Sequence, residues 1–173
     1  ITEPFSHQDK QLGSLLERQG KSIVILLNKW DRVEQTSEQA RNAVIANVRS
    51  TFPYLSFASI VFVSGKTGYR VHQILPLLPR LQEIRKTEIP NEALRHFLEA
   101  ALRRHKPSRG KGTRYPDLLG MTQTHTQPPI FQVIVKYRTS LHRSYLQYLE
   151  HQLREHFDFL GCPILITIKK QKK

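Results

Sequence analysis

The chain has 173 residues, of which 39% are hydrophobic, so it is long enough to bury the core of one ordinary domain or two small ones. No apolar run approaches the roughly 18 residues of a membrane span, and the first residues lack the features of a secretory signal. The single cysteine, Cys162, excludes an internal disulfide and a paired-cysteine zinc site. We therefore expect a folded, cytoplasmic protein with no membrane partner, in which Cys162 is a small buried residue.

The net charge of +13 is unevenly distributed along the chain. Residues 1–88 carry 12 basic and 8 acidic side chains, whereas residues 89–173 carry 15 and 6. An excess of this kind favours phosphate backbones through counterion release, and the binding then weakens steeply with salt. The second half is therefore the candidate for binding a polyanion. The alternative is a merely soluble basic surface, because charge alone defines neither fold nor specificity.

The first half predicts a strand, a helix and a second strand, in that order. Residues 22–27 form an unbroken apolar run, which is typical of a strand covered on both faces in a parallel sheet. Apolar residues then recur at helical spacing from an N-cap candidate at Ser37 to Phe52, and residues 59–64 predict a second buried strand. This crossover forces parallel pairing, so the loops that follow both strands lie at the sheet edge where ligands bind.

Helical patterns flank this unit on both sides. Residues 7–19 predict a helix that ends at Gly20. Residues 71–81 carry another helical stripe that Pro76 and Pro79 interrupt, so we expect a kinked or broken helix. Residues 86–91 then read as a linker.

The second half predicts an α-β-β-α-β domain. Asn91 is the N-cap candidate of its first helix, whose apolar face runs from Leu94 to Leu102. A basic loop rich in Gly and Pro follows at residues 106–120. The remaining elements are strands near 118–124 and 130–137, a helix near 141–156, and a final strand in which Ile164, Ile166 and Ile168 share one face ahead of a solvated lysine tail.

The loop after the first strand has the chemistry of a guanine reader. Guanine presents N1–H and an exocyclic amine as paired donors, and the single carboxylate of Asp31 can accept both hydrogen bonds. Asn28 can bridge the base and the neighbouring loop, while the stem of Lys29 packs over the ring. The alternative is that Asp31 is a loop carboxylate that caps a nearby N–H, which is common for Asp in loops.

The loop after the second strand, Ser64-Gly65-Lys66, fits the same interpretation. It supplies a backbone N–H for the purine oxygen and a second alkyl stem for the opposite face of the base. Gly65-Lys66-Thr67 does not end a phosphate-binding P-loop, because that motif needs a glycine at position 60, which is Ile60. No D-x-x-G that would position a magnesium-bound phosphate is found either. The chain thus lacks the machinery of GTP hydrolysis.

These motifs resemble the C-terminal part of the Der/EngA family of bacterial tandem GTPases, which are involved in large ribosomal subunit assembly. Residues 7–31, which end in "LLNKWD", resemble the stretch of the second G domain after its switch II region. "FVSGKTGYRV" resembles the fifth G motif, where Ala is usual in place of Gly65. "PPIFQVIV", "SYLQYLEHQLREHF" and "GCPILITIKK" resemble the KH-like domain.

By this resemblance, residues 1–88 are the C-terminal portion of a P-loop-type G domain, a parallel-sheet fragment in the α/β class, and residues 89–173 are an α+β KH-like domain. The sequence begins at Ile1, after the phosphate and magnesium motifs, so we expect a fragment that depends on missing upstream G domains. The resemblance implies GTP or GDP as cofactor, of which this chain contacts only the guanine, and Mg²⁺ only in the full-length protein. It implies no catalytic residue, so the chain alone is expected to be inactive. The implied guanine-binding residues are Asn28, Lys29, Asp31, Ser64, Gly65 and Lys66.

The KH-like half is expected to meet the large ribosomal subunit, both rRNA and ribosomal proteins. The nearest match to the G-x-x-G loop that grips RNA in KH domains, "RGKG", has the wrong spacing and place, so direct sequence reading is not expected. The alternative for its charged run is a solvated surface. The RNA-contact candidates are Arg103, Arg104, Lys106, Arg109, Lys111 and Arg114, with the tail from Lys169 to Lys173.

Other residues are assigned structural or surface positions. Tyr145 and Tyr148 can stack on bases, but their helical spacing favours the core. The eight histidines have no metal-binding spacing, since His151 and His156 are five apart, and we expect no metal site. Two rival functions stay open: an RNA- or ribosome-binding module whose guanine loop is vestigial, and a stand-alone protein-interaction domain.

Overall fold

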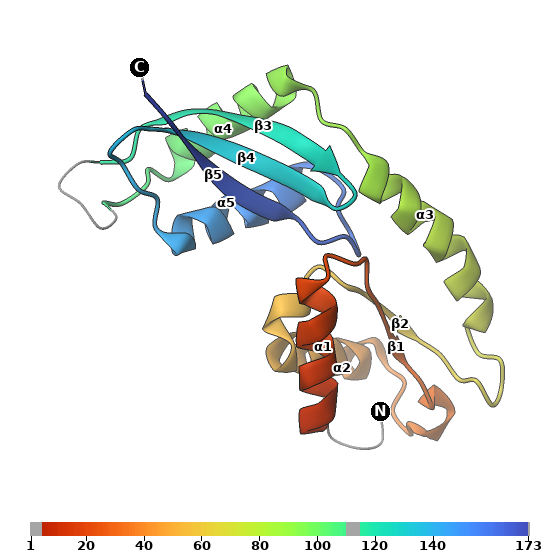
Figure 1. Ribbon diagram of the computed structural model, residues 1–173. Coiled ribbons are helices and arrows are strands. Elements are labelled where there is room, and N and C mark those ends of the chain that lie inside the picture. The colour runs from red at the N-terminus through yellow and green to blue at the C-terminus, as the bar shows by residue number, and fades with distance from the viewer. Residues whose placement is uncertain (1–4, 110–114, 173) are drawn as a thin grey trace. The chain divides into compact units, whose positions relative to one another are not determined.

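The structure is a computed structural model that describes residues 5–109 and 115–172 (Figure 1). The chain divides into two compact units. The first unit consists of the chain up to Ile84 together with the short segment Leu160–Pro163. The second unit consists of Arg85–Phe159 together with the chain from Ile164 onward. The domain boundary predicted after residue 88 stays a prediction. Each unit is described separately.

The first unit contains the predicted parallel crossover. Strands β1 (Val24–Leu27) and β2 (Ser59–Phe62) pair in parallel, with Val24 opposite Ser59 and Leu27 opposite Phe62. The remaining elements are α1 (His7–Arg18), α2 (Glu38–Thr51), α3 (Ile74–Lys86) and the short 3₁₀ helices Trp30–Arg32, Pro53–Leu55 and Val71–Gln73.

Local sequence signals explain where the first helices begin and end. Ser37 is the N-cap of α2, and its hydroxyl accepts a hydrogen bond of 3.2 Å from the Ala40 N–H. Ser6 and Asp9 form a capping box at the start of α1. Gly20, with φ +59°, follows the end of α1 in the left-handed conformation that favours glycine. The sequence predicts the cap at Ser37 and the helix end at Gly20, but not the capping box.

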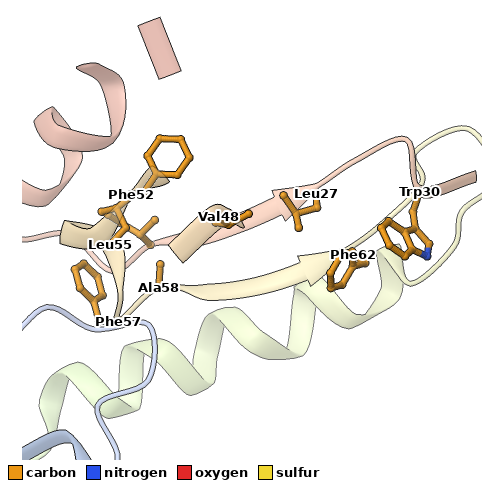
Figure 2. Close-up of a cluster of buried hydrophobic side chains, with 9 residues drawn as sticks. Leu27, Trp30, Val48, Phe52, Leu55, Phe57, Ala58 and Phe62 are labelled. Atoms are coloured by element: carbon orange, nitrogen blue, oxygen red, sulfur yellow. The ribbon is translucent and has the colours of Figure 1, made fainter. Parts of the chain in front are cut away.

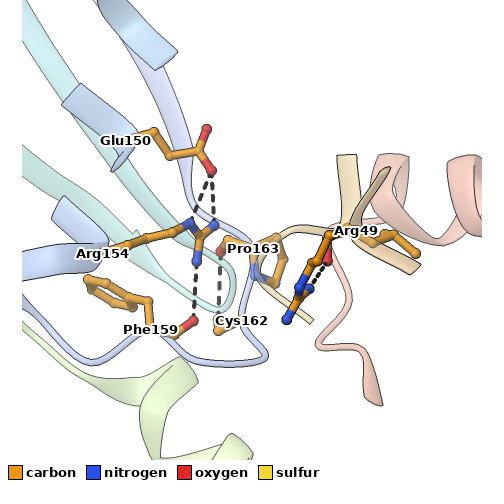
Figure 3. Close-up of polar contacts among 7 residues, drawn as sticks. Arg49, Glu150, Arg154, Phe159, Cys162 and Pro163 are labelled. Carbon is orange, nitrogen blue, oxygen red and sulfur yellow. Dashed lines mark hydrogen bonds and ion pairs between the residues drawn. The ribbon is translucent and has the colours of Figure 1, made fainter. Parts of the chain in front are cut away.

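The core of the first unit lies along β1 and β2, against the end of α2 (Figure 2). Val48, at 1% exposure, belongs to this cluster, and Phe52 and Phe57 lie at one end of it (Figure 2). Full burial of each such side chain contributes about 1.5–3 kcal/mol. Arg49 closes the turn between α2 and β2, because its guanidinium donates to the carbonyls of Leu55 and Ala58, at 2.8 Å each (Figure 3).

Two expectations for the first unit are wrong. The first strand is not covered on both faces, since Leu26 is 44% exposed and the strand has one paired neighbour within the described residues. The helix with two prolines, which was expected to be kinked or broken, runs continuously from Ile74 to Lys86, so the break is wrong and the kink stays a prediction. Pro76 lies in the first turn of α3, where the N–H has no helical partner to lose, and Pro79 lies inside the helix. Of its apolar stripe, Leu81 is buried whereas Leu75 is 72% exposed.

A short segment from late in the sequence completes the base of the small sheet. The Gly161 N–H donates to the Phe57 carbonyl at 2.7 Å, and the Ile23 N–H donates to the Gly161 carbonyl at 3.0 Å. Gly161 has φ +71°, and a Cβ there would overlap the Leu81 side chain. Cys162 beside it is fully buried, as predicted (Figure 3). Its burial is that of a small apolar residue in a packed segment.

The second unit has the predicted α-β-β-α-β order (Figure 1). Strand β4 is central, antiparallel to β3 and parallel to β5, in the order β3-β4-β5. The register places Met121 opposite Val133, and Ile130 opposite Leu165. The elements are α4 (Asn91–Arg104), β3 (Leu118–Thr126), β4 (Pro129–Lys136), α5 (Arg143–His156) and β5 (Leu165–Gln171).

Alternate residues of β4 and one face of each helix form the core of the second unit. Phe131 and Val133 on β4 are fully buried, as are Leu94 on α4 and Leu149 on α5. Arg154 joins α5 to the turn that follows it, because its guanidinium donates to the Phe159 carbonyl at 3.2 Å and to the Glu150 carboxylate at 2.9 Å (Figure 3). The apolar spacing of α4 and α5 predicts these inward faces correctly.

The structure differs from expectation at both ends of this unit. Pro90, not Asn91, is the N-cap of α4, and Asn91 is the first helical residue without a side-chain cap. The lysines expected in a solvated tail begin within β5, where Lys169 lies opposite Ile134 and Lys170 opposite Val135. Backbone pairing with β4 therefore extends the strand despite its charged side chains. Of the isoleucines expected to share a face, Ile164 is 5% exposed and Ile168 is 37% exposed.

None of the helices within residues 5–109 and 115–172 is long and apolar enough to cross a membrane.

Candidate functional site

The predicted guanine-binding residues lie at one edge of the small sheet. Asn28 follows β1 directly, and Asp31 lies in the 3₁₀ turn Trp30–Arg32. Ser64 lies two residues after the end of β2. Because β1 and β2 are parallel, both loops leave the same edge of the sheet.

Hydrogen bonds join the two loops to each other. The Gly65 N–H donates to Asn28 Oδ1 at 3.0 Å, and the Ser64 hydroxyl donates to Asp31 Oδ1 at 2.5 Å. The backbone adds a third link, in which the Trp30 N–H donates to the Val63 carbonyl at 3.1 Å. Asn28 thus bridges to the neighbouring loop as the sequence predicts, while its contact with a base stays a prediction.

The carboxylate of Asp31 is exposed and is held in its ionised form. The Ser64 hydrogen bond lowers the pKa of Asp31, partial desolvation opposes that effect, and the charges of Lys66 and Arg32 add smaller reductions. A hydrogen bond from the backbone N–H of Asp31 itself also lowers this pKa. The carboxylate is exposed and its two oxygens offer about four lone-pair sites, so it keeps acceptor capacity for donors on a ligand.

The two lysines of the site lie on exposed backbone. Lys29 has φ +65°, a left-handed conformation that is uncommon for a residue with a side chain and that clusters at functional sites. Lys66 is exposed, and its N–H has no hydrogen bond within the ranges that the structure describes. The Gly65 N–H is already bonded to Asn28, so the Lys66 N–H is the donor that this loop can offer to a purine oxygen.

Ser64 is fully buried and organises the second loop. Its hydroxyl, besides donating to Asp31, accepts a hydrogen bond of 3.2 Å from the Thr67 N–H. Its own N–H donates to the Tyr69 carbonyl at 3.1 Å. One side chain thus fixes both the turn of its own loop and the position of the opposing carboxylate.

Trp30, for which the sequence predicts no role, is a buried residue in the same 3₁₀ turn as Asp31. Its side chain is 3% exposed, and its ring lies 4.4 Å from that of Phe62. The Arg41 guanidinium lies 6.0 Å from the Trp30 ring centroid and donates to the Tyr69 hydroxyl at 3.0 Å. The available signal was a large aromatic residue between two exposed charged residues.

The predicted lack of phosphate and magnesium motifs stays a prediction. The letters D-x-x-G occur at Asp117–Gly120, but this segment leads into β3 of the second unit, and Asp117 Oδ2 lies 3.6 Å from Lys136 Nζ. Among the described residues there is no group of three or more His, Cys, Asp or Glu side chains that could hold a metal ion. We therefore derive no step through Mg²⁺.

The basic candidates lie at the end of α4 and in the segment after it. Arg103, Arg104, Lys106 and Arg109 are exposed, and Arg104 donates to Gln152 Oε1 at 2.9 Å. The candidates Lys111 and Arg114 lie outside the described residues.

Of the two tyrosines of α5, Tyr145 belongs to the core, as predicted, whereas Tyr148 is half-buried. Tyr145 is 3% exposed, and its hydroxyl donates to the His105 carbonyl at 2.8 Å. The Tyr148 hydroxyl donates to the Ala101 carbonyl at 3.0 Å. Burial, followed by the neighbouring Tyr148, raises the pKa of Tyr145 to about 12. These bonds fix the C-terminal end of α4 rather than offering a stacking surface.

Comparison with known proteins gives consistent matches. Residues 88–169 match the family described as the C-terminal KH-domain-like part of EngA bacterial GTPase enzymes. GTPase Der of Streptococcus agalactiae serotype III is 34% identical over 170 residues, and GTPase Der of Caldanaerobacter subterraneus is 35% identical over the same length. Each alignment covers 98% of this chain and 38% of the relative, so the chain spans well under half the length of these proteins. A crystal structure of an Aquifex aeolicus Era variant bound to GDP.AlF4- is 12% identical, with a TM-score of 0.39 over 99% of this chain and 63% of that chain, which is too low a likeness to define the fold.

The fold is a mixed α/β architecture in which a parallel crossover precedes a KH-like domain. The matches to Der across nearly the whole chain and to the EngA family model over its second half point to the same group of GTPases. The chain belongs to the Der/EngA family and corresponds to its C-terminal region.

Proposed function

We propose that this chain is the guanine-recognition and KH-like part of a ribosome-assembly GTPase that acts in large ribosomal subunit biogenesis in the cytoplasm. Asn28, Lys29, Asp31, Ser64, Gly65 and Lys66 bind the guanine base of GTP or GDP. The observation that supports the proposal is the ionised and exposed Asp31 carboxylate, held by the Ser64 hydroxyl at the sheet edge that both loops leave. Membership of a GTPase family supports it.

The loops favour guanine over adenine by charge and hydrogen bonding. Asp31 accepts from both guanine N1–H and the exocyclic amine, whereas adenine offers an acceptor at N1 and no amine at C2. A carboxylate left unpaired against the wrong base can produce discrimination on the order of 10⁴-fold. The Lys66 N–H donates to the guanine O6, and the Lys29 and Lys66 stems cover the two faces of the ring.

The phosphates and Mg²⁺ are handled outside this sequence, in the upstream G domains of the full-length protein. Much of a nucleotide's affinity comes from contacts to phosphate, so the chain alone binds GDP with a Kd that is millimolar or weaker, roughly. It does not turn over GTP. Turnover above a blank that Asp31→Asn abolishes would contradict this assignment.

Nuclear magnetic resonance of the ¹⁵N-labelled chain tests the guanine assignment directly. Added GDP should shift the amide signals of Gly65 and Lys66, and equal ADP should not. Asp31→Asn should reverse the preference toward xanthosine diphosphate, because the carboxamide donates to the C2 carbonyl that replaces the amine. Asp9→Asn is the matched control, since Asp9 is another exposed carboxylate whose pKa a serine lowers. Equal shifts with GDP and ADP would overturn the guanine assignment.

A second candidate function is a ribosome-binding module whose guanine loops are vestigial, and the exposed cations after α4 favour it. Binding to purified large ribosomal subunits across a salt series tests it. An Arg103/Arg104/Lys106→Glu variant should lose salt-sensitive binding, whereas Lys10/Arg18/Lys21→Glu, which changes the net charge equally, should retain it. If the module alone accounts for the function, Asp31→Ala leaves ribosome binding unchanged in the full-length protein as well.

A further inference from the structure

Most basic side chains of the second unit are concentrated at one end of its sheet. Residues 103–109, 115–118, 135–144 and 169–172 carry ten Lys and Arg side chains and one carboxylate, Asp117. The other acidic residues of this unit lie outside these segments: Glu88, Glu92, Glu99, Glu150, Glu155 and Asp158. We call the four segments the basic end. Its segregation from the carboxylates makes it a focused positive surface rather than an average one.

Described contacts hold the four segments together. The Lys136 N–H donates to the Asp117 carbonyl at 2.9 Å, which joins the start of β3 to the end of β4. The Tyr137 N–H donates to the Gln171 carbonyl at 2.9 Å, which joins the end of β4 to the end of β5 (Figure 1). The Tyr145 hydroxyl brings the chain after α4 to the same place through His105.

Tyr137 is an exposed aromatic ring in the middle of this charge. The side chain is 45% exposed, although it is large and apolar enough to gain from burial. Lys172 Nζ lies 5.2 Å from the ring centroid, and the Arg138 guanidinium lies 5.9 Å from it. Both cations are within the range of a cation–π contact, and both are carried on long stems that can shift toward a phosphate.

The backbone fixes this ring at the tip of a tight turn. The Thr139 N–H and its hydroxyl both donate to the Lys136 carbonyl, at 3.2 Å and 2.6 Å, so residues 136–139 form a closed four-residue turn. Arg138 occupies the third position with φ +65°, where glycine is the usual residue. A glycine would remove both the strain and a cation. A cation kept in a strained conformation beside an exposed ring indicates a use for the pair.

We propose that Tyr137 is a stacking platform for an unpaired base of single-stranded RNA, with Lys172 and Arg138 binding the phosphates on either side. This inference rests on the proposed ribosomal-RNA function and specifies the form of RNA that the KH-like unit takes. An aromatic face gives any base a stacking partner, and flanking cations track the backbone. Paired RNA keeps its bases stacked on one another and offers no face to the ring, so a duplex does not fit.

The test is binding of the whole chain to a short single-stranded RNA that contains one 2-aminopurine, whose fluorescence is quenched on stacking. We expect quenching by the unaltered chain. Tyr137→Leu should abolish the quenching and weaken binding by about 5- to 100-fold, the range found for loss of one base stack. Tyr137→Phe is the matched control, because it keeps the ring and removes only the hydroxyl, and it should bind and quench like the unaltered chain.

The charges are tested separately by salt dependence. Loss of one phosphate contact reduces the slope of log affinity against log salt by about 0.7 on a single strand. Lys172→Gln should show this reduction and keep the quenching, whereas Lys10→Gln, which removes an exposed lysine of the first unit, should change neither. A duplex of the same sequence and polyglutamate should both compete poorly.

Failure of this inference is distinguishable from failure of the proposed function. Equal binding by Tyr137→Leu, absent quenching with the unaltered chain, or equal competition by the duplex would overturn the stacking platform, whatever happens with ribosomal subunits. Effective displacement by polyglutamate would overturn it too, because the surface would then select charge alone. If the oligonucleotide stacks on Tyr137 but the chain fails to bind large subunits, the stacking site stands and the ribosomal function fails.

Discussion

At Asp31 a neutral hydroxyl, rather than a neighbouring cation, is the main cause of the lowered carboxyl pKa. The folded pKa lies below the unfolded value of about 4, so the stabilisation by this contact is fully present above that value. It is lost as the pH falls through the lower, folded pKa. The loop that carries Asp31 therefore keeps its negative charge and its link to Ser64 throughout the neutral range.

Replacing Ser64 tests that cause. In Ser64→Ala the pKa of Asp31 should rise toward its ordinary value, because the hydroxyl that stabilises the ionised form is gone while the desolvation that opposes it stays. A ¹³C titration of the Asp31 carboxyl carbon measures this shift. Asp9 is the internal reference, since Ser6 lowers its pKa and the substitution does not touch that pair. An unchanged titration of Asp31 would mean that its own backbone N–H and the charges of Lys66 and Arg32 lower the pKa instead.

Gly65 is a glycine without a geometric need. A Cβ there would lie 3.8 Å from Asn28 Oδ1, which is an ordinary contact. This agrees with the fifth G motif that residues 62–71 resemble, in which alanine is usual at this position. Gly65→Ala should stabilise the first unit by about 0.4–1 kcal/mol, because alanine restricts the unfolded chain. Urea unfolding followed by the fluorescence of Trp30, the one tryptophan of the chain, measures this. Destabilisation would show that the loop needs a conformation that alanine resists.

At the scale of the element, the helical and strand patterns predict the order of both units because each depends on local periodicity. The α-β-β-α-β order follows from the inward faces of α4 and α5 and the alternation of β4. The misses occur where a local rule competes with pairing or with a neighbour. Pro90 takes the cap position ahead of Asn91, and Lys169 enters β5 because the adjacent β4 backbone supplies partners.

The two helix starts give a matched stability test. Ser37→Ala should destabilise the first unit by about 1 kcal/mol, because the Ala40 N–H loses the hydroxyl that caps it. Asn91→Ala should change stability by no more than a few tenths of a kcal/mol, roughly, since Asn91 is already inside α4 and makes no capping bond. Urea midpoints of both variants give the comparison. A cost at Asn91 equal to that at Ser37 would restore Asn91 as the functional cap.

At the scale of the whole molecule, the sequence pattern reveals the charge asymmetry but not the contacts that concentrate it. The excess of basic residues after residue 88 is visible in the composition, whereas the basic end exists because distant segments meet through Asp117 and Gln171. The candidate site divides in the same way. Asn28 and Asp31 are found by motif, but Trp30 and Arg41 are held by contacts with Phe62 and Tyr69, 32 and 28 residues further along the chain, which periodicity does not encode.

Gly161 allows a test of packing between residues far apart in the sequence, because it pairs with Ile23 and Phe57. Gly161→Ala should destabilise the unit that contains Trp30 by about 2–4 kcal/mol, because it adds left-handed strain and overlaps the Leu81 side chain. Gly68→Ala is the matched control: φ is +75°, but a Cβ there meets nothing within 4 Å, so only the backbone strain of about 1–2 kcal/mol applies. Trp30 fluorescence during urea unfolding reads both. Equal effects would mean that the packing around Gly161 adapts.

The pairing of Gly161 with Ile23 and Phe57 also sets an order of events during synthesis. The base of the small sheet needs a segment that leaves the ribosome about 75 residues after Ile84, so the first unit stays incomplete while the KH-like unit is being made. Until then the Phe57 carbonyl and the Ile23 N–H lack these partners. Translation that stops before residue 161 would therefore release a first unit with an open sheet base, a target for chaperones and proteases rather than a folded domain.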